Sequence, residues 1–172
     1  MTAYVALLRA VNVGGRKLIM DELKAIAVEL GFAGARTYIA SGNLLFACEL
    51  SEKRVKGMLE SRLSEHMNAA VPVIVRTAAE LKRVVKANPF AEQPGNRVAA
   101  IFLDAPPPAD VAKTARNRAD DERIAVGERE VYVAYGKLGM GRSRLQIPAA
   151  KAGTARNMNT VAKLAELVME MS

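Results

Sequence analysis

Three polar segments of the chain combine arginine or asparagine with small, turn-forming residues, and these are the side chains that could do chemistry. They are residues 6–17 (ALLRAVNVGGRK), residues 36–46 (RTYIASGNLLF) and residues 154–160 (TARNMNT). Arginine presents a planar set of donors that matches phosphate or carboxylate, and asparagine both donates and accepts hydrogen bonds. A hydrophobic core needs none of these groups. We therefore interpret the three segments as one surface site for an anion, assembled from distant parts of the chain.

The first segment has the composition of a phosphate-binding loop. Asn12, Gly14 and Gly15 follow an apolar run, and glycines at such a turn let the backbone approach a ligand closely. Arg9 precedes them at the expected end of a strand and would flank the same pocket. The spacing matches neither GxxxxGK[ST] nor GxGxxG. The alternative is a tight turn in which the glycines serve backbone geometry alone.

The second segment places Ser41 and Asn43 between two apolar runs. Polar side chains in a turn of this kind could reach the same ligand from another side. The alternative is closure of a hairpin, which small and amide residues also favour.

The third segment is typical of a helix start, with Thr154 or Asn157 as the capping residue. Free N–H groups in a first helical turn favour an anion, and Arg156 would add a charged fork. The preceding loop, GMGRSR, contributes Arg142 and Arg144. The alternatives are simple capping for the helix start and a solvated tip for the loop.

Charge is distributed unevenly along the chain, whose formal net charge is +7. Between Glu130 and Glu166 there is no acidic residue, and the first twenty residues also lack one. The first and third polar segments lie inside these two acid-free stretches. This coincidence favours an anion site over a basic face that is merely solvated.

Several kinds of site are disfavoured by composition. Cys48 is the only cysteine and His66 the only histidine, so an internal disulfide and a cysteine-based metal site are excluded. We expect no metal site, a buried thiol at Cys48 and a surface histidine at His66. No carboxylate near the polar segments is an evident general base, which favours binding over catalysis. The sequence specifies neither a reaction, nor a cofactor, nor an oligomeric state.

The chain has no apolar run near the roughly 20 residues that cross a membrane. Its first residues, MTAYVALLRAVN, lack the basic start and the cleavage site of a secretory signal. We therefore expect no membrane partner and a cytoplasmic location.

Hydrophobic periodicity predicts an α+β fold. Strands at 4–9, 36–39, 44–48 and 71–76, with helices at 20–30 and 51–67, give the β-α-β-β-α-β order of a ferredoxin-like unit. The second half follows a similar order without a visible sequence repeat: a helix at 77–87, a strand at 97–103, a helix at 110–118, a hairpin from 123–126 and 130–134, and a last helix from about residue 154. We predict two ferredoxin-like halves with antiparallel sheets packed against helices, at residues 1–87 and 97–172, joined by a linker at 88–96.

Several motifs together resemble the domain-of-unknown-function family 1697. They are YVALLRAVNVGG, LIMDELKAIAVELGF, RTYIASGNLLF, VPVIVRTAAEL, NPF and TARNMNTVAKLAEL, in that order over essentially the whole chain. Ala10, Val11 and Met158 depart from the family pattern, which more often has LLRGINVGG and TARNWNT. The resemblance implies two ferredoxin-like halves and brings no settled activity, cofactor or partner.

Three hypotheses follow. The first is binding of a small phosphorylated or nucleotide-like ligand by Arg9, Asn12, the Gly14–Gly15 backbone and Arg156. The second is an RNA-binding module, which the basic charge favours, although the clustered aromatic residues of an RNA-recognition motif are absent. The third is a structural role, in which the motifs close the interface between the two halves.

Overall fold

The computed structural model describes residues 1–9 and 17–171 and divides the chain into two compact units. Unit 1 comprises residues 1–81 and 164–172, and unit 2 comprises residues 82–163. Residues 88–96, the expected linker, lie within unit 2. The expected boundaries at residues 87 and 97 remain a prediction about which pieces fold on their own.

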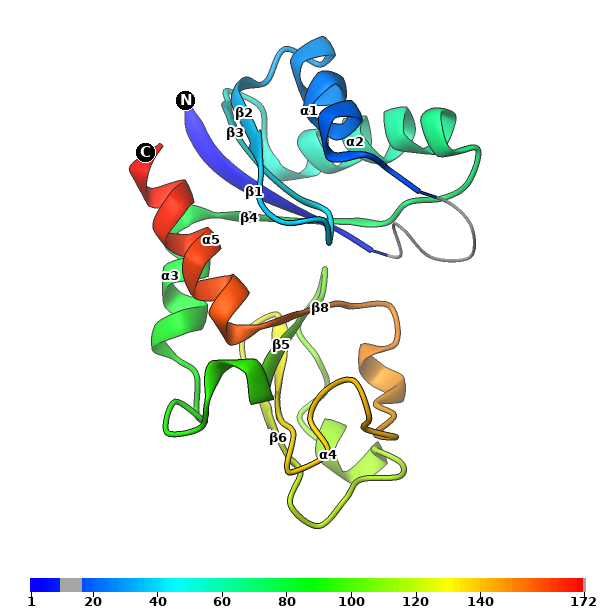
Figure 1. Cartoon of the computed structure of the whole chain (residues 1–172), viewed down its shortest axis with the longest axis vertical. Helices are drawn as coiled ribbons and strands as arrows, with labels where there is room; N and C mark the ends of the chain where they lie inside the picture. Colours follow the sequence, from blue (N-terminus) through cyan, green and yellow to red (C-terminus); the bar gives the residue numbers. More distant parts are fainter. Residues whose placement is uncertain (10–16, 172) are drawn as a thin grey trace. The chain divides into compact units, whose positions relative to one another are not determined.

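Unit 1 has the predicted ferredoxin-like order. Its elements are β1 (Thr2–Leu8), α1 (Met20–Glu29), β2 (Ala33–Thr37), β3 (Asn43–Cys48), α2 (Glu52–Met67) and β4 (Val73–Thr77). The strands form one antiparallel sheet in the order β2-β3-β1-β4. Figure 1 shows α1 and α2 over the same face of this sheet.

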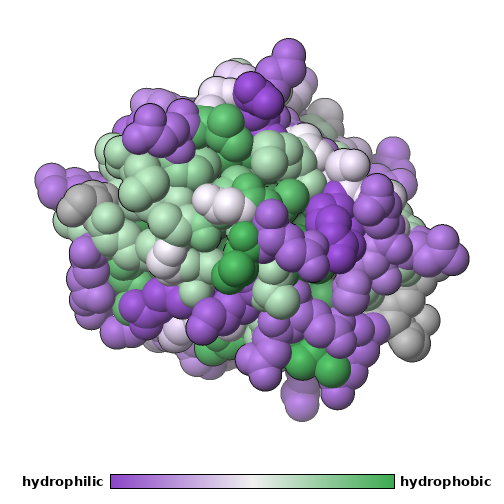
Figure 2. Space-filling model, turned by 90° about the horizontal axis from the view of Figure 1, so that it is seen from above, coloured by the Kyte–Doolittle hydropathy of each residue, from purple (hydrophilic) through white to green (hydrophobic). Residues whose placement is uncertain are grey.

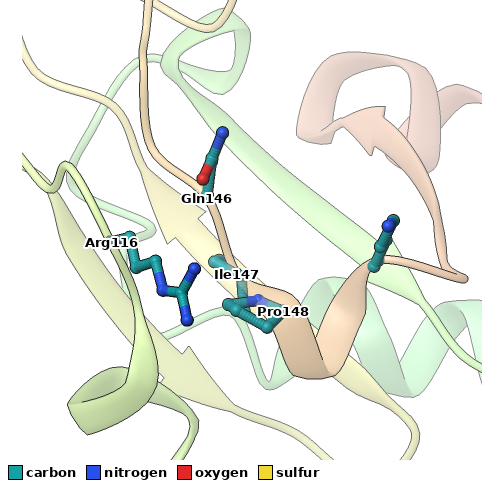
Figure 3. A pocket seen from close by; sticks show the side chains of 5 residues that line it. Arg116, Gln146, Ile147 and Pro148 are labelled. Atoms are coloured by element: carbon teal, nitrogen blue, oxygen red, sulfur yellow. The ribbon is translucent and has the colours of Figure 1, made fainter.

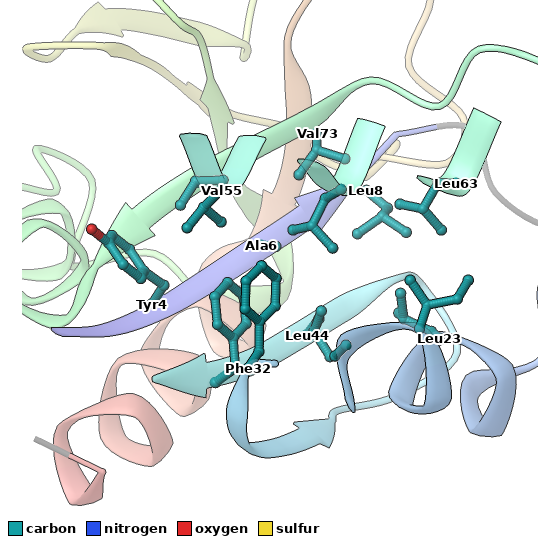
Figure 4. Close-up of a cluster of buried hydrophobic side chains, with 14 of the residues drawn as sticks. Tyr4, Ala6, Leu8, Leu23, Phe32, Leu44, Val55, Leu63 and Val73 are labelled. Atoms are coloured by element: carbon teal, nitrogen blue, oxygen red, sulfur yellow. The ribbon is translucent and has the colours of Figure 1, made fainter. Parts of the chain in front are cut away.

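A hydrophobic cluster fills the space between the sheet of unit 1 and its two helices (Figure 4). Alternate residues of β1, such as Ala6 and Leu8, point toward Leu23 of α1 and toward Leu63 of α2. The two helices also contact each other, and the Arg62 Nε atom lies 3.0 Å from a carboxylate oxygen of Glu29. The helical layer therefore covers this face of the sheet.

Local signals set the helix ends of unit 1 as the sequence predicts. The Ser51 hydroxyl accepts a hydrogen bond from the backbone N–H of Arg54, which confirms Ser51 as the cap of α2. Thr77 and Glu80 form the predicted capping box, with distances of 2.9 and 3.2 Å between their reciprocal donors and acceptors. Helix α3 (Ala78–Lys86) follows directly.

Unit 2 repeats the strand order of unit 1. Its elements, from the end of α3 onward, are η1 (Gly95–Arg97), β5 (Val98–Phe102), α4 (Val111–Thr114), β6 (Arg123–Val126), β7 (Glu130–Ala134), η2 (Pro148–Ala150), β8 (Thr154–Asn157) and the start of α5 (Met158–Glu170). The sheet order, β6-β7-β5-β8, matches β2-β3-β1-β4 strand for strand. The fold is thus α+β with two ferredoxin-like halves, as predicted.

The two halves differ in what covers the sheet. In unit 2 the four-residue α4 stands where unit 1 has α1, and the three-residue η2 stands where unit 1 has α2. The buried cluster on this side of the sheet is correspondingly small and consists of Leu103, Val111, Val131, Val133 and Ala150. Loops, rather than helices, complete the layer.

The opposite face of the second sheet carries larger side chains. Phe102, Tyr132 and Arg156 share this face, as the strand registers show. The Tyr132 hydroxyl donates a 2.8 Å hydrogen bond to the carbonyl of Val84, so the end of α3 covers this side.

Two predicted elements of unit 2 are wrong in extent or type. Residues 154–157 form β8 and pair with β5, and the last helix begins at Met158 instead of near Thr154. The helix expected at 110–118 ends at Thr114, because Arg116 pairs with Gln146 in an isolated β-bridge. In both cases pairing with a distant segment overrides local propensity.

The surface mixes both kinds of side chain: Figure 2 shows apolar areas bordered by hydrophilic atoms. Ile19, Val28 and Ile39 are among the exposed apolar residues, and scattered exposed apolar side chains are usual. In the described part of the chain, no helix combines the length and the apolar character that crossing a membrane requires.

Candidate anion-binding pocket

A cavity of about 420 Å³ lies among the loops of unit 2. The described residues that line it are Arg116, Gln146, Ile147, Pro148 and Lys151. Figure 3 shows the Arg116 guanidinium directed toward Ile147 and Pro148, while the Gln146 amide extends in another direction. Two cations and an amide therefore share one cavity with an apolar wall.

A short backbone pairing fixes the two sides of the pocket. The N–H of Arg116 donates to the carbonyl of Gln146 at 2.8 Å, and the N–H of Gln146 donates to the carbonyl of Arg116 at 2.9 Å. The first side follows α4, and the second leads into η2. The pocket thus lies beside α4 and η2, the two shortened helices of unit 2. In unit 1 the equivalent elements are α1 and α2, which pack against each other.

Glu122 ties the same two segments together a few residues away. Its carboxylate, only 1% exposed, accepts a 2.8 Å hydrogen bond from the N–H of Ala119 and a short hydrogen bond from the hydroxyl of Ser143. The Ser143 hydroxyl also accepts from the N–H of Leu145 at 3.1 Å. These bonds hold the glycine-rich loop in place as it approaches Gln146.

The electrostatic character of the pocket is positive. Within residues 1–9 and 17–171, neither the Arg116 nor the Lys151 side chain has a hydrogen-bond or ion-pair partner, and no carboxylate lines the cavity. Three other cavities of unit 2 each include a carboxylate from the set Asp120, Asp121, Glu122, Glu128 and Glu130. Those cavities also contain cations, such as Lys113 and Arg118 in one and Lys137 in another. The pocket beside Arg116 therefore differs from them in having no carboxylate in its described lining that would compete with an anion.

Arg142 and Arg144, expected to join the site, are exposed and lie on either side of Ser143 in the loop that leads into the pocket. Neither lines the cavity. Their place in the site remains a prediction.

Arg156 lies in a strand instead of the predicted helix start, whereas Asn157 stands at the start of a helix as predicted. Arg156 lies in β8 with 9% of its surface exposed, and its Nη1 donates to the carbonyl of Ala155 at 2.9 Å. Burial lowers the pKa of this guanidinium to about 10. Asn157 caps α5, because its Oδ1 accepts a 3.0 Å hydrogen bond from the N–H of Thr160. These contacts match the capping alternative for Asn157 and a structural environment for Arg156.

Ser41 and Asn43 close the turn between β2 and β3. The fully buried Asn43 amide donates to the carbonyl of Tyr38 and to the Ser41 hydroxyl, both at 2.9 Å. Gly42 has a φ of 84°, a left-handed conformation that glycine adopts at little cost. This geometry fits the hairpin alternative, and a ligand role for the two residues remains a prediction.

Arg9 is half-buried directly after β1, and its N–H donates to the carbonyl of Pro72 at 3.0 Å. Asn12, Gly14 and Gly15 lie outside the described residues. The predicted convergence of this loop with the other two polar segments therefore remains a prediction.

Sequence reasoning missed Arg116 and Gln146 as pocket residues. Arg116 falls in a segment predicted to be helical, and its pairing with Gln146 carries no local sequence signal. The sequence did point to Lys151, because this residue lies in the acid-free stretch after Glu130 that favoured an anion site. Metal binding has no support in the residues that the structure describes, where no group of three or more His, Cys, Asp or Glu side chains could hold an ion.

The fold and the pocket define an α+β protein of two ferredoxin-like units with a basic cavity in the second. The chain belongs to the family described as protein of unknown function (DUF1697), whose model matches residues 1–132. This confirms the resemblance inferred from the motifs. The matched range includes Arg116 and ends before Gln146 and before the TARNMNT segment.

A solved structure has the same fold. The conserved bacterial protein SP0830 from Streptococcus pneumoniae matches with a TM-score of 0.77 and 20% sequence identity, over 97% of this chain and 98% of that chain. At this identity the likeness concerns the fold alone. A search of curated proteins finds no match to this chain.

Proposed function

We propose that the protein binds a small phosphorylated or nucleotide-like anion in the basic pocket of unit 2. The observation that carries the proposal is the pair of cations, Arg116 and Lys151, in a cavity of about 420 Å³ whose described lining has no carboxylate. The guanidinium would engage two oxygens of a phosphate, and the ammonium would add a point charge. No carboxylate or histidine that could act as a general base is among the described residues that line the pocket, which favours binding over catalysis.

The surroundings of the two cations support this role. Ile147 also packs against the buried cluster of unit 2, so the wall beside the Arg116 guanidinium is apolar and held in place. Arg116 and Lys151 are exposed, so an anion can reach both charges from solvent, and the apolar wall adds contact area next to the guanidinium.

Thermal unfolding with and without phosphate compounds tests the proposal. A ligand at a hundred times its Kd should stabilise the protein by about 2.7 kcal/mol, which raises Tm by roughly 5–10 °C in a chain of this size. Arg116→Ala should abolish the shift. Arg54→Ala is the matched control, because Arg54 is exposed on α2 and loses the same charge far from the pocket along the chain. An equal shift in wild type and Arg116→Ala would refute the proposed site.

Two further measurements in the same experiment distinguish this proposal from the three-segment site and from RNA binding. Arg156→Ala should lower Tm and leave the phosphate-induced shift intact; loss of that shift would favour the three-segment site predicted from the sequence. Short RNA should stabilise the protein only weakly at moderate salt. A large shift with RNA that vanishes as salt rises would favour a nucleic-acid module, for which the exposed Arg142 and Arg144 are the supporting observation.

A further inference from the structure

The pocket is larger than a small anion requires, and part of its lining is uncharged. A cavity of about 420 Å³ is far larger than a phosphate ion requires, given that one water molecule occupies roughly 30 Å³ of the liquid. It falls within the range of about 300–1,000 Å³ that is usual for small organic ligands. The extra space is bordered by Gln146, Ile147 and Pro148, which carry no charge.

These three residues offer two kinds of contact. Ile147 and Pro148 present an apolar surface next to the Arg116 guanidinium, and Figure 3 shows the Gln146 amide reaching away from that cation. The backbone of Gln146 is fixed by both hydrogen bonds of its pairing with Arg116, and no described residue bonds to its side chain. A glutamine amide both donates and accepts hydrogen bonds, as the edge of a nucleobase requires.

We infer that the ligand of this pocket is a nucleoside monophosphate, an inference that rests on the proposed anion site. Arg116 and Lys151 hold the phosphate, the face of the base packs on Ile147 and Pro148, and the edge of the base meets the Gln146 amide. Enzymes that flip a base out of a nucleic-acid strand hold it in the same way, by hydrogen bonds to its edge and packing against aromatic or apolar side chains. The chain has no tryptophan, and no aromatic residue is among the described residues that line the pocket, so the aliphatic wall provides this support.

Isothermal titration calorimetry on the full chain tests the inference with AMP, GMP, CMP, UMP, ribose 5-phosphate and inorganic phosphate. At least one nucleotide should bind about tenfold more tightly than ribose 5-phosphate. Gln146→Leu, which keeps the side-chain size, should remove about tenfold of that nucleotide's affinity and leave ribose 5-phosphate unchanged. Gln93→Leu is the matched control, because Gln93 lines a different cavity of unit 2. Arg116→Ala should weaken every phosphate compound.

The outcomes separate the two proposals. If ribose 5-phosphate binds as tightly as all four nucleotides, or if Gln146→Leu has no effect, the nucleotide inference is wrong and the anion site stands. If no phosphate compound binds, both are wrong. Thermal unfolding of each variant without ligand shows whether a loss of affinity comes from a loss of folded protein.

Discussion

Units 1 and 2 share a strand order and differ in the layer that covers one face of each sheet. In unit 1 the layer consists of two helices of 10 and 16 residues, whose packing buries a large apolar cluster. In unit 2 the corresponding helices have 4 and 3 residues, and loops take their place. The cavity lined by Arg116 and Lys151, which have no ion-pair partner among the described residues, lies among these loops. The same strand order can therefore carry either a helix-covered core or an open cavity among loops, depending on the length of the connecting helices.

The largest effect should come from the helical layer. Leu59 of α2 is fully buried in the cluster of unit 1, so Leu59→Ala should lower the free energy of unfolding by about 2–5 kcal/mol. Leu145→Ala, in the half-buried loop layer of unit 2, should cost clearly less. Urea denaturation measures both. Equal losses would show that the loop layer is packed as tightly as the helices.

Gly153 tests how closely the loop before β8 packs against β5. A Cβ at this position would lie 2.6 Å from Ile101 Cγ2 and 2.9 Å from the carbonyl oxygen of Phe102. Gly153→Ala should therefore destabilise the protein by about 1–3 kcal/mol, measured by the same denaturation. An unchanged midpoint would mean that the strand and the loop separate easily.

Arg156 differs from the pocket cations Arg116 and Lys151 in being buried, and this difference can be tested by its pH dependence. Burial lowers its folded-state pKa to about 10, well below the usual range of a guanidinium, so folding opposes its protonated form. The resulting destabilisation is fully present well below pH 10 and fades as the pH rises above 10. Raising the pH from 8 to 11 should therefore increase the free energy of unfolding of the wild-type protein by about 1 kcal/mol more than that of Arg156→Met. Denaturation at the two pH values measures the difference; a constant difference would contradict this account of Arg156.

The smallest effect is expected in α2 itself. Gly57 lies on the exposed side of the helix, and a Cβ there would have no neighbour within 4 Å. Gly57→Ala should raise the free energy of unfolding by about 0.5–1 kcal/mol, because alanine favours the helix. A lower Tm in thermal unfolding would show that the helix is not free to take a side chain at this position.

Local signals in the sequence were sufficient for much of the fold. Ser51, Thr77 and Glu80 mark helix starts by contacts between residues close in sequence, and the apolar runs of both sheets were identified. β8 was missed because Thr154 and Asn157 have the composition of helix caps, whereas the pairing that makes a strand comes from β5. The strand order shared by the two units is likewise invisible as a sequence repeat.

The candidate site was harder to predict than the fold. The positive charge of the cavity followed in part from the sequence, since the acid-free stretch contains Lys151. The partner across the cavity, Arg116, is brought there by a backbone pairing between segments about thirty residues apart. Arg156 is also buried, and a sequence motif gives no measure of burial.

The most direct test of the account is to map the bound anion by two-dimensional ¹⁵N NMR during a titration with inorganic phosphate. The account predicts that the backbone amides of Arg116, Gln146 and Lys151 shift together and saturably, while those of α1 and α2 stay unchanged. Shifts centred instead on Arg9, on residues 41–43 and on residues 154–160 would contradict it and favour the site predicted from the sequence. No saturable shift anywhere would show that the pocket does not bind phosphate.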